Sequence, residues 1–395
     1  MAPRLILQRH VTSSPKAARI WLPSSGPRPA RLTKAEAVPP QPPHRAAQRP
    51  TQRNSTMVEK VEMVNKVDNT ALKGAQPDKP LLLVLEAFSP EALQAMAAHF
   101  TLIIMPSPQW PDAASLAPVA GSITAIATAG APGVPQPIMD MLPNLKMVAV
   151  NGVGTDAINL QACKERGIAV STTQGLQTDA VADMAMALLL AVKRHVVFND
   201  RYVREGLWAT KGYPPLGSGL AGNKLGLVGY GTIGQAIAER ARAFRMEVGY
   251  FCRHEVAGQK GAGARFFPAL AEMASWCDDL VLILPGGPAT QNLVDGAILR
   301  ALGAQGCLVN VARGSVVDEP ALLKALQERT IMGAGLDVFW NEPDINKAFF
   351  SLDNVVLSPH QGSATIQTRV AMARNVLDNL LAFFADRPLL TPVKL

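Results

Sequence analysis

Cysteine is scarce in this chain. Its 395 residues include four cysteines, Cys163, Cys252, Cys277 and Cys307, and no two of them have the C-x-x-C spacing. This scarcity argues against a disulfide-stabilised secreted domain and against a cysteine-based metal site. We therefore expect reduced thiols, mostly in the core, in a cytoplasmic protein that uses no metal.

Long hydrophobic runs are also absent. Apolar residues make up 48% of the chain and charged residues 17%, but no uninterrupted stretch of 18 apolar residues occurs. A transmembrane helix needs about 20 mostly apolar residues, so we predict no membrane-spanning helix and no membrane partner. The length and composition instead fit a globular enzyme with two domains.

Acidic residues are almost missing from the first 56 positions, which hold ten Lys and Arg but only one acid, Glu36. The whole chain has 38 basic and 31 acidic residues and a net charge of +7. Positions 57–395 therefore hold 28 basic and 30 acidic residues, a net charge of −2. Because the excess of positive charge is confined to the N-terminal segment, we expect no nucleic-acid partner.

Residues 1–79 are predicted to be a disordered, basic leader and linker. The first 56 are rich in Pro, Ser, Ala and Arg and lack the periodicity needed to bury apolar surface against the entropy of ordering. An Arg-rich, acid-poor leader is typical of an organellar transit peptide. Alternatively, the natural start is Met57 or Met63. We favour the later start, because the prolines would break the amphipathic helix used in mitochondrial import.

From Pro80 onward, short apolar runs alternate with helical patterns. The expected strands lie at 81–85, 101–105, 123–127, 147–150, 225–228, 248–251, 280–284, 307–311, 333–336 and 355–357, and the main expected helices at 91–100, 179–194, 235–244 and 364–384. This alternation predicts an α/β fold of doubly wound parallel sheets. We expect two Rossmann/flavodoxin-like domains with the active site in the cleft between them. The dinucleotide-binding domain would be 179–362, inserted into a substrate domain made of 80–178 plus 363–395.

A glycine-rich loop, Gly-Tyr-Gly-Thr-Ile-Gly at 229–234, lies between a predicted strand and a predicted helix. Gly229 permits a tight turn, Gly231 lets the backbone approach a pyrophosphate, and Gly234 lets the helix pack on the strand. The N–H groups at the start of the helix would face the phosphates. Such a motif is weak alone, but this strand–loop–helix context predicts a dinucleotide site. The residues assigned to the cofactor here are Gly229, Gly231, Thr232, Ile233 and Gly234.

The end of the next predicted strand indicates which dinucleotide binds. NAD enzymes usually have Asp or Glu there to bind the ribose hydroxyls. In this chain the strand ends in Cys252-Arg253-His254, and the first acid is Glu255. Arg253 is well placed to bind a 2′-phosphate, although it could also be a solvated surface residue. We predict NADPH as the cofactor, with NADH as the alternative.

Three polar residues, Arg313, Glu342 and His360, follow predicted strands further along the chain. Ligands bind at the carboxyl ends of strands in open α/β sheets. There a guanidinium can bind a keto oxygen and a carboxylate with fixed geometry, an imidazole can transfer a proton, and a carboxylate can fix the imidazole tautomer. Each residue alone could be a surface group. Together they predict hydride transfer to or from a small 2-oxo acid.

The predicted substrate domain contains a glycine-rich turn, Asn-Gly-Val-Gly-Thr-Asp at 151–156. Free backbone N–H groups in such a turn can bind a carboxylate, and we assign this role to Val153 and Gly154. Thr178 and Asp179 are expected to cap the helix that follows. Thr178 would then lie at the domain hinge, near the nicotinamide.

These motifs resemble those of the D-isomer-specific 2-hydroxyacid dehydrogenase family, in its glyoxylate/hydroxypyruvate reductase branch. The similarity covers about residues 80–395. It rests on Asn-Gly-Val-Gly-Thr-Asp (151–156), Thr-Asp-Ala-Val-Ala-Asp (178–183), Arg-Tyr-Val-Arg-Glu-Gly-Leu-Trp (201–208), Val-Gly-Tyr-Gly-Thr-Ile-Gly (228–234), Asn-Val-Ala-Arg-Gly (310–314), Leu-Asp-Val-Phe (336–339) and Pro-His-Gln-Gly-Ser (359–363).

The resemblance implies a role for each matching residue. Arg313 would polarise the keto oxygen and bind the carboxylate. His360 would donate the proton during reduction, with Glu342 behind it, while hydride passes from the nicotinamide. The backbone near Val311 and the Asp337 side chain would bind the carboxamide. Gly362 completes the cofactor residues we assign.

The resemblance also implies a homodimer, formed through the nucleotide-binding domains with an arm at 201–208. NADPH-using relatives tend to have Ser-Arg-Thr or Ser-Arg-Ser where this chain has Cys252-Arg253-His254, so two hydroxyl donors are missing. The alternative functions are an NAD-dependent D-lactate or phosphoglycerate dehydrogenase and a dinucleotide-binding corepressor scaffold.

Overall fold

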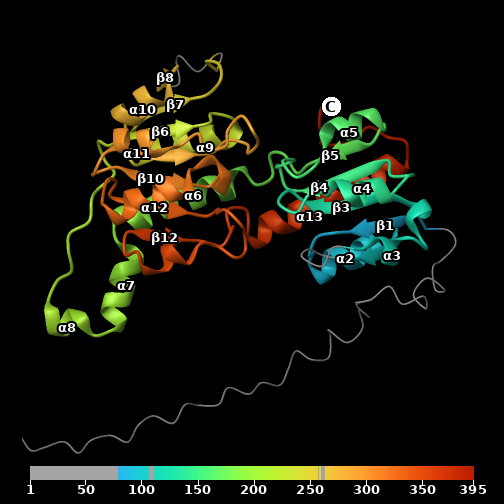
Figure 1. The fold of residues 1–395 in the computed structure, drawn as a ribbon, viewed down its shortest axis with the longest axis horizontal. Coiled ribbons are helices and arrows are strands. Elements are labelled where there is room, and N and C mark those ends of the chain that lie inside the picture. Colours follow the sequence, from blue (N-terminus) through green and yellow to red (C-terminus); the bar gives the residue numbers. More distant parts are fainter. Residues whose placement is uncertain (1–78, 106–110, 257, 259–262) are drawn as a thin grey trace, which may run out of the picture. The chain divides into compact units, whose positions relative to one another are not determined.

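The computed structural model describes residues 79–105, 111–256, 258 and 263–395 (Figure 1). Residues 1–78 of the predicted leader and linker, including the alternative starts at Met57 and Met63, lie outside these residues. Within the described ranges, no helix combines the length and the apolar character that crossing a membrane requires.

The first part of the chain forms a five-stranded sheet in which every strand pair is parallel. Its strand order, β2-β1-β3-β4-β5, is the flavodoxin-like order. The strands are β1 (Leu81–Val84), β2 (Thr101–Ile104), β3 (Ile123–Ala129), β4 (Met147–Asn151) and β5 (Ala169–Ser171), and the helices between them are α2 (Pro90–Ala97), α3 (Ala113–Leu116), α4 (Gln136–Met141) and α5 (Leu160–Glu165), with a 3₁₀ turn at Ala120–Ser122.

The last helix of the chain, α13 (Ile366–Phe384), packs on this first sheet. Its buried Val376, Leu377 and Leu380 belong to one hydrophobic cluster with Leu82 and Val84 of β1. Because side chains alternate along a strand, Leu83 belongs to the cluster on the other face of the sheet. The domain limits of 80–178 plus 363–395 and of 179–362 stay a prediction.

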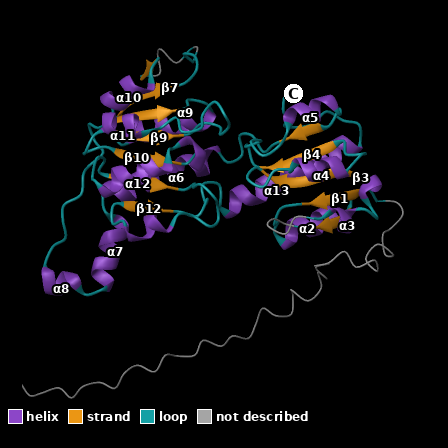
Figure 2. Cartoon of the chain, in the orientation of Figure 1, coloured by secondary structure: helices purple, strands orange, loops and turns teal. Residues whose placement is uncertain are grey.

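The middle of the chain forms a seven-stranded parallel sheet with the order β12-β11-β10-β9-β6-β7-β8. Its strands are β6 (Lys224–Val228), β7 (Glu247–Phe251), β8 (Ala264–Phe267), β9 (Asp279–Leu282), β10 (Cys307–Asn310), β11 (Gly333–Leu336) and β12 (Val355–Leu357). In each sheet the strands lie among helices (Figure 2).

Helices cover both faces of the seven-stranded sheet, as expected of a doubly wound fold. Residues of α6 (Thr178–Lys193) and α9 (Thr232–Ala243) form one core with Leu225 and Leu227 of β6. Residues of α10 (Leu270–Trp276), α11 (Gly296–Leu302) and α12 (Glu319–Gln327) form the other core with Leu280 and Leu282 of β9. The remaining elements are α7 (Val196–Arg204), α8 (Leu207–Lys211) and 3₁₀ turns at Gly314–Val316 and Lys347–Ser351.

The predicted fold, two doubly wound parallel sheets, is confirmed, but two details are wrong. The helix expected at 235–244 begins at Thr232, because Gly231 is its N-cap and the end of the glycine loop is already helical. Thr178 and Asp179 do not cap α6, because both lie inside its first turn and Gln177 is at the N-cap position. The short strands β5 and β8 were not predicted.

Candidate active site

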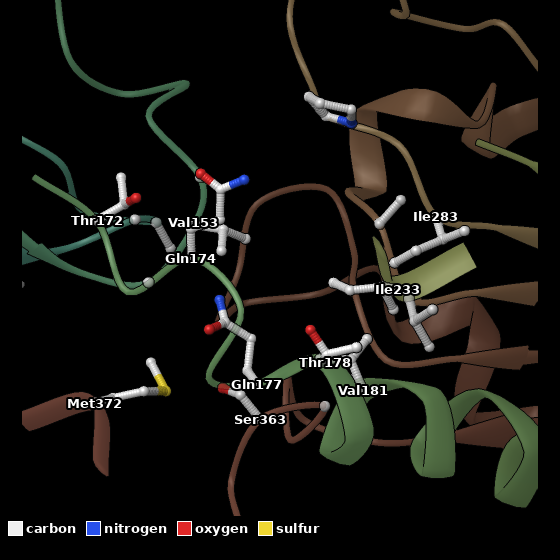
Figure 3. Close-up of a pocket in the computed structure, with 18 of the residues that line it drawn as sticks. Val153, Thr172, Gln174, Gln177, Thr178, Val181, Ile233, Ile283, Ser363 and Met372 are labelled. Atoms are coloured by element: carbon white, nitrogen blue, oxygen red, sulfur yellow. The ribbon is translucent and has the colours of Figure 1, made fainter. Parts of the chain in front are cut away.

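A cavity of about 560 Å³ is lined by residues at or just after the ends of strands of both sheets and by residues of α6, α9 and α13 (Figure 3). Figure 3 shows Thr178, Ile233 and Ile283 on one side of it and Thr172 and Met372 on the other. Twelve of the predicted site residues line this cavity: Val153, Gly154, Thr178, Gly231, Thr232, Ile233, Gly234, Val311, Arg313, Asp337, His360 and Gly362.

The other three predicted residues, Gly229, Arg253 and Glu342, are not part of the lining. Gly229 is the first residue of the glycine loop, and its positive φ angle shapes the turn. Glu342 lies behind His360. Arg253 is exposed just after β7, and in the described part of the chain nothing forms a hydrogen bond or ion pair with its side chain.

His360 and Glu342 form a hydrogen-bonded pair at the cavity wall. The imidazole Nδ1 lies 2.7 Å from Glu342 Oε2, and Glu342 Oε1 accepts a hydrogen bond from the Phe339 N–H at 2.7 Å. An ionised carboxylate can only accept, so Nδ1 carries a hydrogen and Nε2 is left for a ligand.

The charge of Glu342 is maintained by its neighbours. Burial alone would raise the pKa of this carboxyl. The hydrogen bond and charge of His360, the Phe339 N–H and the Arg313 charge together hold the pKa below its usual value. Glu342 therefore stays ionised at neutral pH and can orient a proton-donating imidazole.

Asp337 fixes the turn that carries His360. This buried carboxylate accepts hydrogen bonds from the Ser358 hydroxyl at 2.6 Å and from the N–H groups of Gln361 and Gly362 at 2.7 and 2.8 Å. The His360 N–H donates to the Asp337 carbonyl at 2.8 Å. From the sequence, Asp337 was predicted only to bind the cofactor, and this stays a prediction. Its role in positioning His360 was not predicted.

Arg313 follows β10 in a turn held by the Asn310 side chain, which accepts from the Ala312 N–H and donates to the Arg313 carbonyl. The Arg313 Nε donates to Asp156 Oδ2 at 2.8 Å, although these residues are 157 positions apart. Asp156 is the last residue of the Asn-Gly-Val-Gly-Thr-Asp motif, and no partner was predicted for it. No signal in the sequence links the two.

The Arg313 guanidinium lies directly against the turn that was predicted to bind a carboxylate. A Cβ added at Gly154 would overlap the Arg313 Nη2, so only glycine allows this approach. When the Gln177 amide is turned to satisfy both of its polar atoms, its oxygen accepts from the Val153 N–H at 3.2 Å. A carboxylate placed here would meet the Arg313 guanidinium and the Gly154 N–H, and it would have to replace Gln177 as the partner of the Val153 N–H.

The glycine loop has the shape needed to hold a dinucleotide. At Gly229 the φ angle is 104° and an added Cβ would overlap the Ile283 carbonyl, and at Gly234 a Cβ would lie 2.5 Å from the Gly229 carbonyl oxygen. The protein itself therefore requires these two glycines. At Gly231, in contrast, an added Cβ would meet nothing within 4 Å.

The open space at Gly231 is therefore room for a ligand. Gly231 is the N-cap of α9, and no N-cap side chain accepts a hydrogen bond from the N–H groups at the start of this helix. The first residues of the helix line the cavity. The first N–H groups of a helix lack partners within it and attract anions. Residues 231–234 thus fit a pyrophosphate. Among the described residues, no group of three His, Cys, Asp or Glu side chains could hold a metal ion.

Comparison with known proteins relates this site to a family. The family described as "D-isomer specific 2-hydroxyacid dehydrogenase, NAD binding domain" matches residues 186–362. The 2-ketogluconate reductase of Gluconobacter oxydans is 50% identical over 80% of this chain and 99% of its own length. The glyoxylate reductase of Pyrococcus furiosus is 40% identical over 77% of this chain and 92% of its own length.

Solved structures show the same similarity. One is the crystal structure of an NADPH-dependent glyoxylate/hydroxypyruvate reductase from Sinorhizobium meliloti in complex with NADP and malonate. It has 40% sequence identity and a TM-score of 0.75, and the match covers 80% of this chain and 97% of that one.

Proposed function

Because the chain belongs to the D-isomer-specific 2-hydroxyacid dehydrogenase family, and is therefore an NAD(P)-dependent oxidoreductase, we propose that it reduces small 2-oxo acids with NADPH. Glyoxylate and hydroxypyruvate are the first candidate substrates, as the names of several relatives suggest. The proposal rests on one observation: the His360–Glu342 pair, Arg313 and the Gly154 turn all lie at the same cavity.

Each side chain has a distinct part in this reaction. Arg313 and the N–H groups of Val153 and Gly154 bind the substrate carboxylate, and Arg313 also polarises the keto oxygen. A bound dinucleotide supplies the hydride that reduces the carbonyl carbon. His360 gives its Nε2 proton to the carbonyl oxygen, and Glu342 stabilises the protonated imidazole and keeps it aimed at the cavity.

The preference for NADPH rests on Arg253. This side chain is exposed after β7, where NAD enzymes usually have an acid, and no described residue forms a hydrogen bond or ion pair with it. The remaining cofactor contacts would come from residues 231–234, Thr178, Val311, Asp337 and Gly362, all of which line the cavity.

We extend the proposal to a cytoplasmic homodimer. Large apolar side chains are exposed on and just after α7 and α8, where the dimer arm at 201–208 was expected. Val203 is 56% exposed, Trp208 52%, Tyr213 86% and Leu216 94%. Exposed apolar groups clustered in one segment favour a protein partner, and a second copy of the chain would provide one.

The function can be tested with purified protein, a panel of 2-oxo acids and both cofactors, following absorbance of the reduced nicotinamide. We expect reduction of glyoxylate and hydroxypyruvate, with a higher kcat/KM for NADPH than for NADH. Equal or better turnover with NADH would contradict the cofactor assignment.

Arg313→Ala tests the site itself and should reduce kcat/KM by about 10²–10³-fold, the usual cost of losing one donor to a developing oxyanion. Arg374→Ala, on the exposed side of α13, is the matched control. If dinucleotide still binds to Arg313→Ala but turnover is unaffected, the catalytic assignment is wrong.

A further inference from the structure

The part of the cavity lining that comes from the five-stranded sheet and α13 contains polar side chains with no role so far. Glu86 follows β1, Asn151 ends β4, and Arg369 lies in the first turn of α13. Met372 follows Arg369 along the helix, and Figure 3 shows it with Thr172 on the side away from Ile233. Arg313 and Gly154 line the same cavity, so we place the part of the substrate beyond its carboxylate on this side.

Glu86 and Arg369 are partly buried charges with unused hydrogen-bonding capacity. Burial raises the pKa of the Glu86 carboxyl, and the charge of Arg369 opposes this rise, so the two groups lie close enough to influence each other. No hydrogen bond to either side chain comes from the part of the chain that the structure describes. Because no described residue forms a hydrogen bond to the Glu86 carboxylate, its oxygens can accept hydrogen bonds from a ligand.

Asn151 gives an independent indication of a ligand. Its side chain is only 7% exposed, and its amide oxygen has no hydrogen-bond partner among the described residues. Buried polar atoms are nearly always paired, so an unpaired one on a cavity wall suggests that something outside the protein completes it.

We propose that Glu86, Asn151 and Arg369 form a subsite for hydroxyl groups, so that the preferred substrate is a 2-oxo acid with a polyhydroxylated carbon chain. This inference rests on the proposed function, because Arg313 and the Gly154 turn must hold the carboxylate end. Hydroxyls donate to Glu86 and accept from Arg369, so one kind of group satisfies both charges.

Other substrate tails fit this subsite less well. A second carboxylate would pair with Arg369 but would be repelled by Glu86. An apolar or aromatic tail would bury both charges without partners, which is costly. Glyoxylate has no chain to reach the subsite at all.

The test compares kcat/KM for 2-ketogluconate, glyoxylate, hydroxypyruvate and phenylpyruvate at saturating NADPH. The proteins are the unmodified chain, Glu86→Leu, Glu86→Gln and the control Glu91→Gln, which removes an exposed acid outside the cavity. We expect the unmodified chain to prefer 2-ketogluconate to glyoxylate. In Glu86→Leu the ratio of the two kcat/KM values should fall by about tenfold or more.

The remaining variants sharpen the result. Glu86→Gln should lower the ratio less, because an amide oxygen still accepts a hydrogen bond, and Glu91→Gln should leave it unchanged. If Glu86→Leu does not fold, as judged by thermal unfolding, Arg369→Met provides the same test from α13.

Two outcomes would overturn the subsite alone: reduction of the panel with an unchanged ratio in the folded variants, or a preference of the unmodified chain for phenylpyruvate. Failure to reduce any of the four acids would instead overturn the proposed function, and the subsite with it.

Discussion

The two sheets contribute to the cavity in different ways. Groups from the seven-stranded sheet are already bonded within the protein: His360 to Glu342, the His360 turn to Asp337, and the Arg313 turn to Asn310. The five-stranded sheet and α13 contribute Glu86, Asn151 and Arg369, whose polar atoms are largely unused.

This difference suggests a division of labour. Groups fixed by internal hydrogen bonds are pre-organised, which suits chemistry that is the same for every 2-oxo acid. Groups whose hydrogen-bonding atoms are still unpaired can instead bind the chain of the substrate, which differs from one 2-oxo acid to another. Variants on the seven-stranded side should therefore slow all acids alike, whereas variants of Glu86, Asn151 and Arg369 should change their ranking.

The largest effect is expected from His360→Asn. Loss of a general acid usually costs about 10²–10⁴-fold in rate, and here kcat should fall by that amount for every acid in the panel. His99→Asn, an exposed histidine outside the cavity, is the control. Should His360→Asn change the ranking of the acids instead of lowering all rates together, the division between the two sheets would not hold.

A smaller effect is expected from Gly231→Ala, which tests the cofactor loop without the substrate. Nothing in the protein lies within 4 Å of the added Cβ, so the melting temperature should not change. Binding of NADPH, followed by fluorescence titration, should weaken by roughly tenfold, because the methyl group occupies the approach to the pyrophosphate. Gly121→Ala, which also meets nothing within 4 Å, should bind normally. Equal affinities in the two variants would rule out a phosphate site at this loop.

An effect of similar size to that of Gly231→Ala, but on kcat, is expected from Glu342→Gln. Loss of a charge-assisted hydrogen bond of about 1.5 kcal/mol should lower kcat roughly tenfold for all acids. Because the folded-state pKa of Glu342 is lowered, its stabilising contribution is complete above the unfolded-state pKa and is lost as the pH falls through the folded-state pKa.

The difference in free energy of unfolding between the unmodified chain and Glu342→Gln should accordingly shrink on acidification, as measured by urea denaturation at several pH values. A difference that stays constant from neutral pH to below the folded-state pKa would show that the charge of Glu342 is not stabilised by its surroundings.

The sequence predicted those features that depend on neighbouring residues or on repeated strand–helix units. The glycine loop could be identified because three glycines at fixed spacing lie between a strand and a helix. Arg313 and His360 were identified because each follows a strand and has a recognisable local motif. Glu342 was chosen only in combination with these two.

Features that depend on contacts between residues far apart in the sequence could not be predicted. The Arg313–Asp156 ion pair joins residues 157 positions apart. The proximity of Glu86 and Arg369 requires the C-terminal helix to pack on the first sheet, and neither residue lies in a motif. The first turn of α6 was misplaced because Thr178 is a common capping residue, whereas the backbone there is already helical.

The hydrogen bonds of Asp337 have a consequence for heat inactivation. The turn that carries His360 is attached to the end of β11, a strand inside the sheet, so it cannot open by local fraying without breaking bonds to a buried carboxylate. Surface loops often lose their structure before the rest of a domain unfolds. In this protein the imidazole should instead stay in place until the seven-stranded sheet itself comes apart.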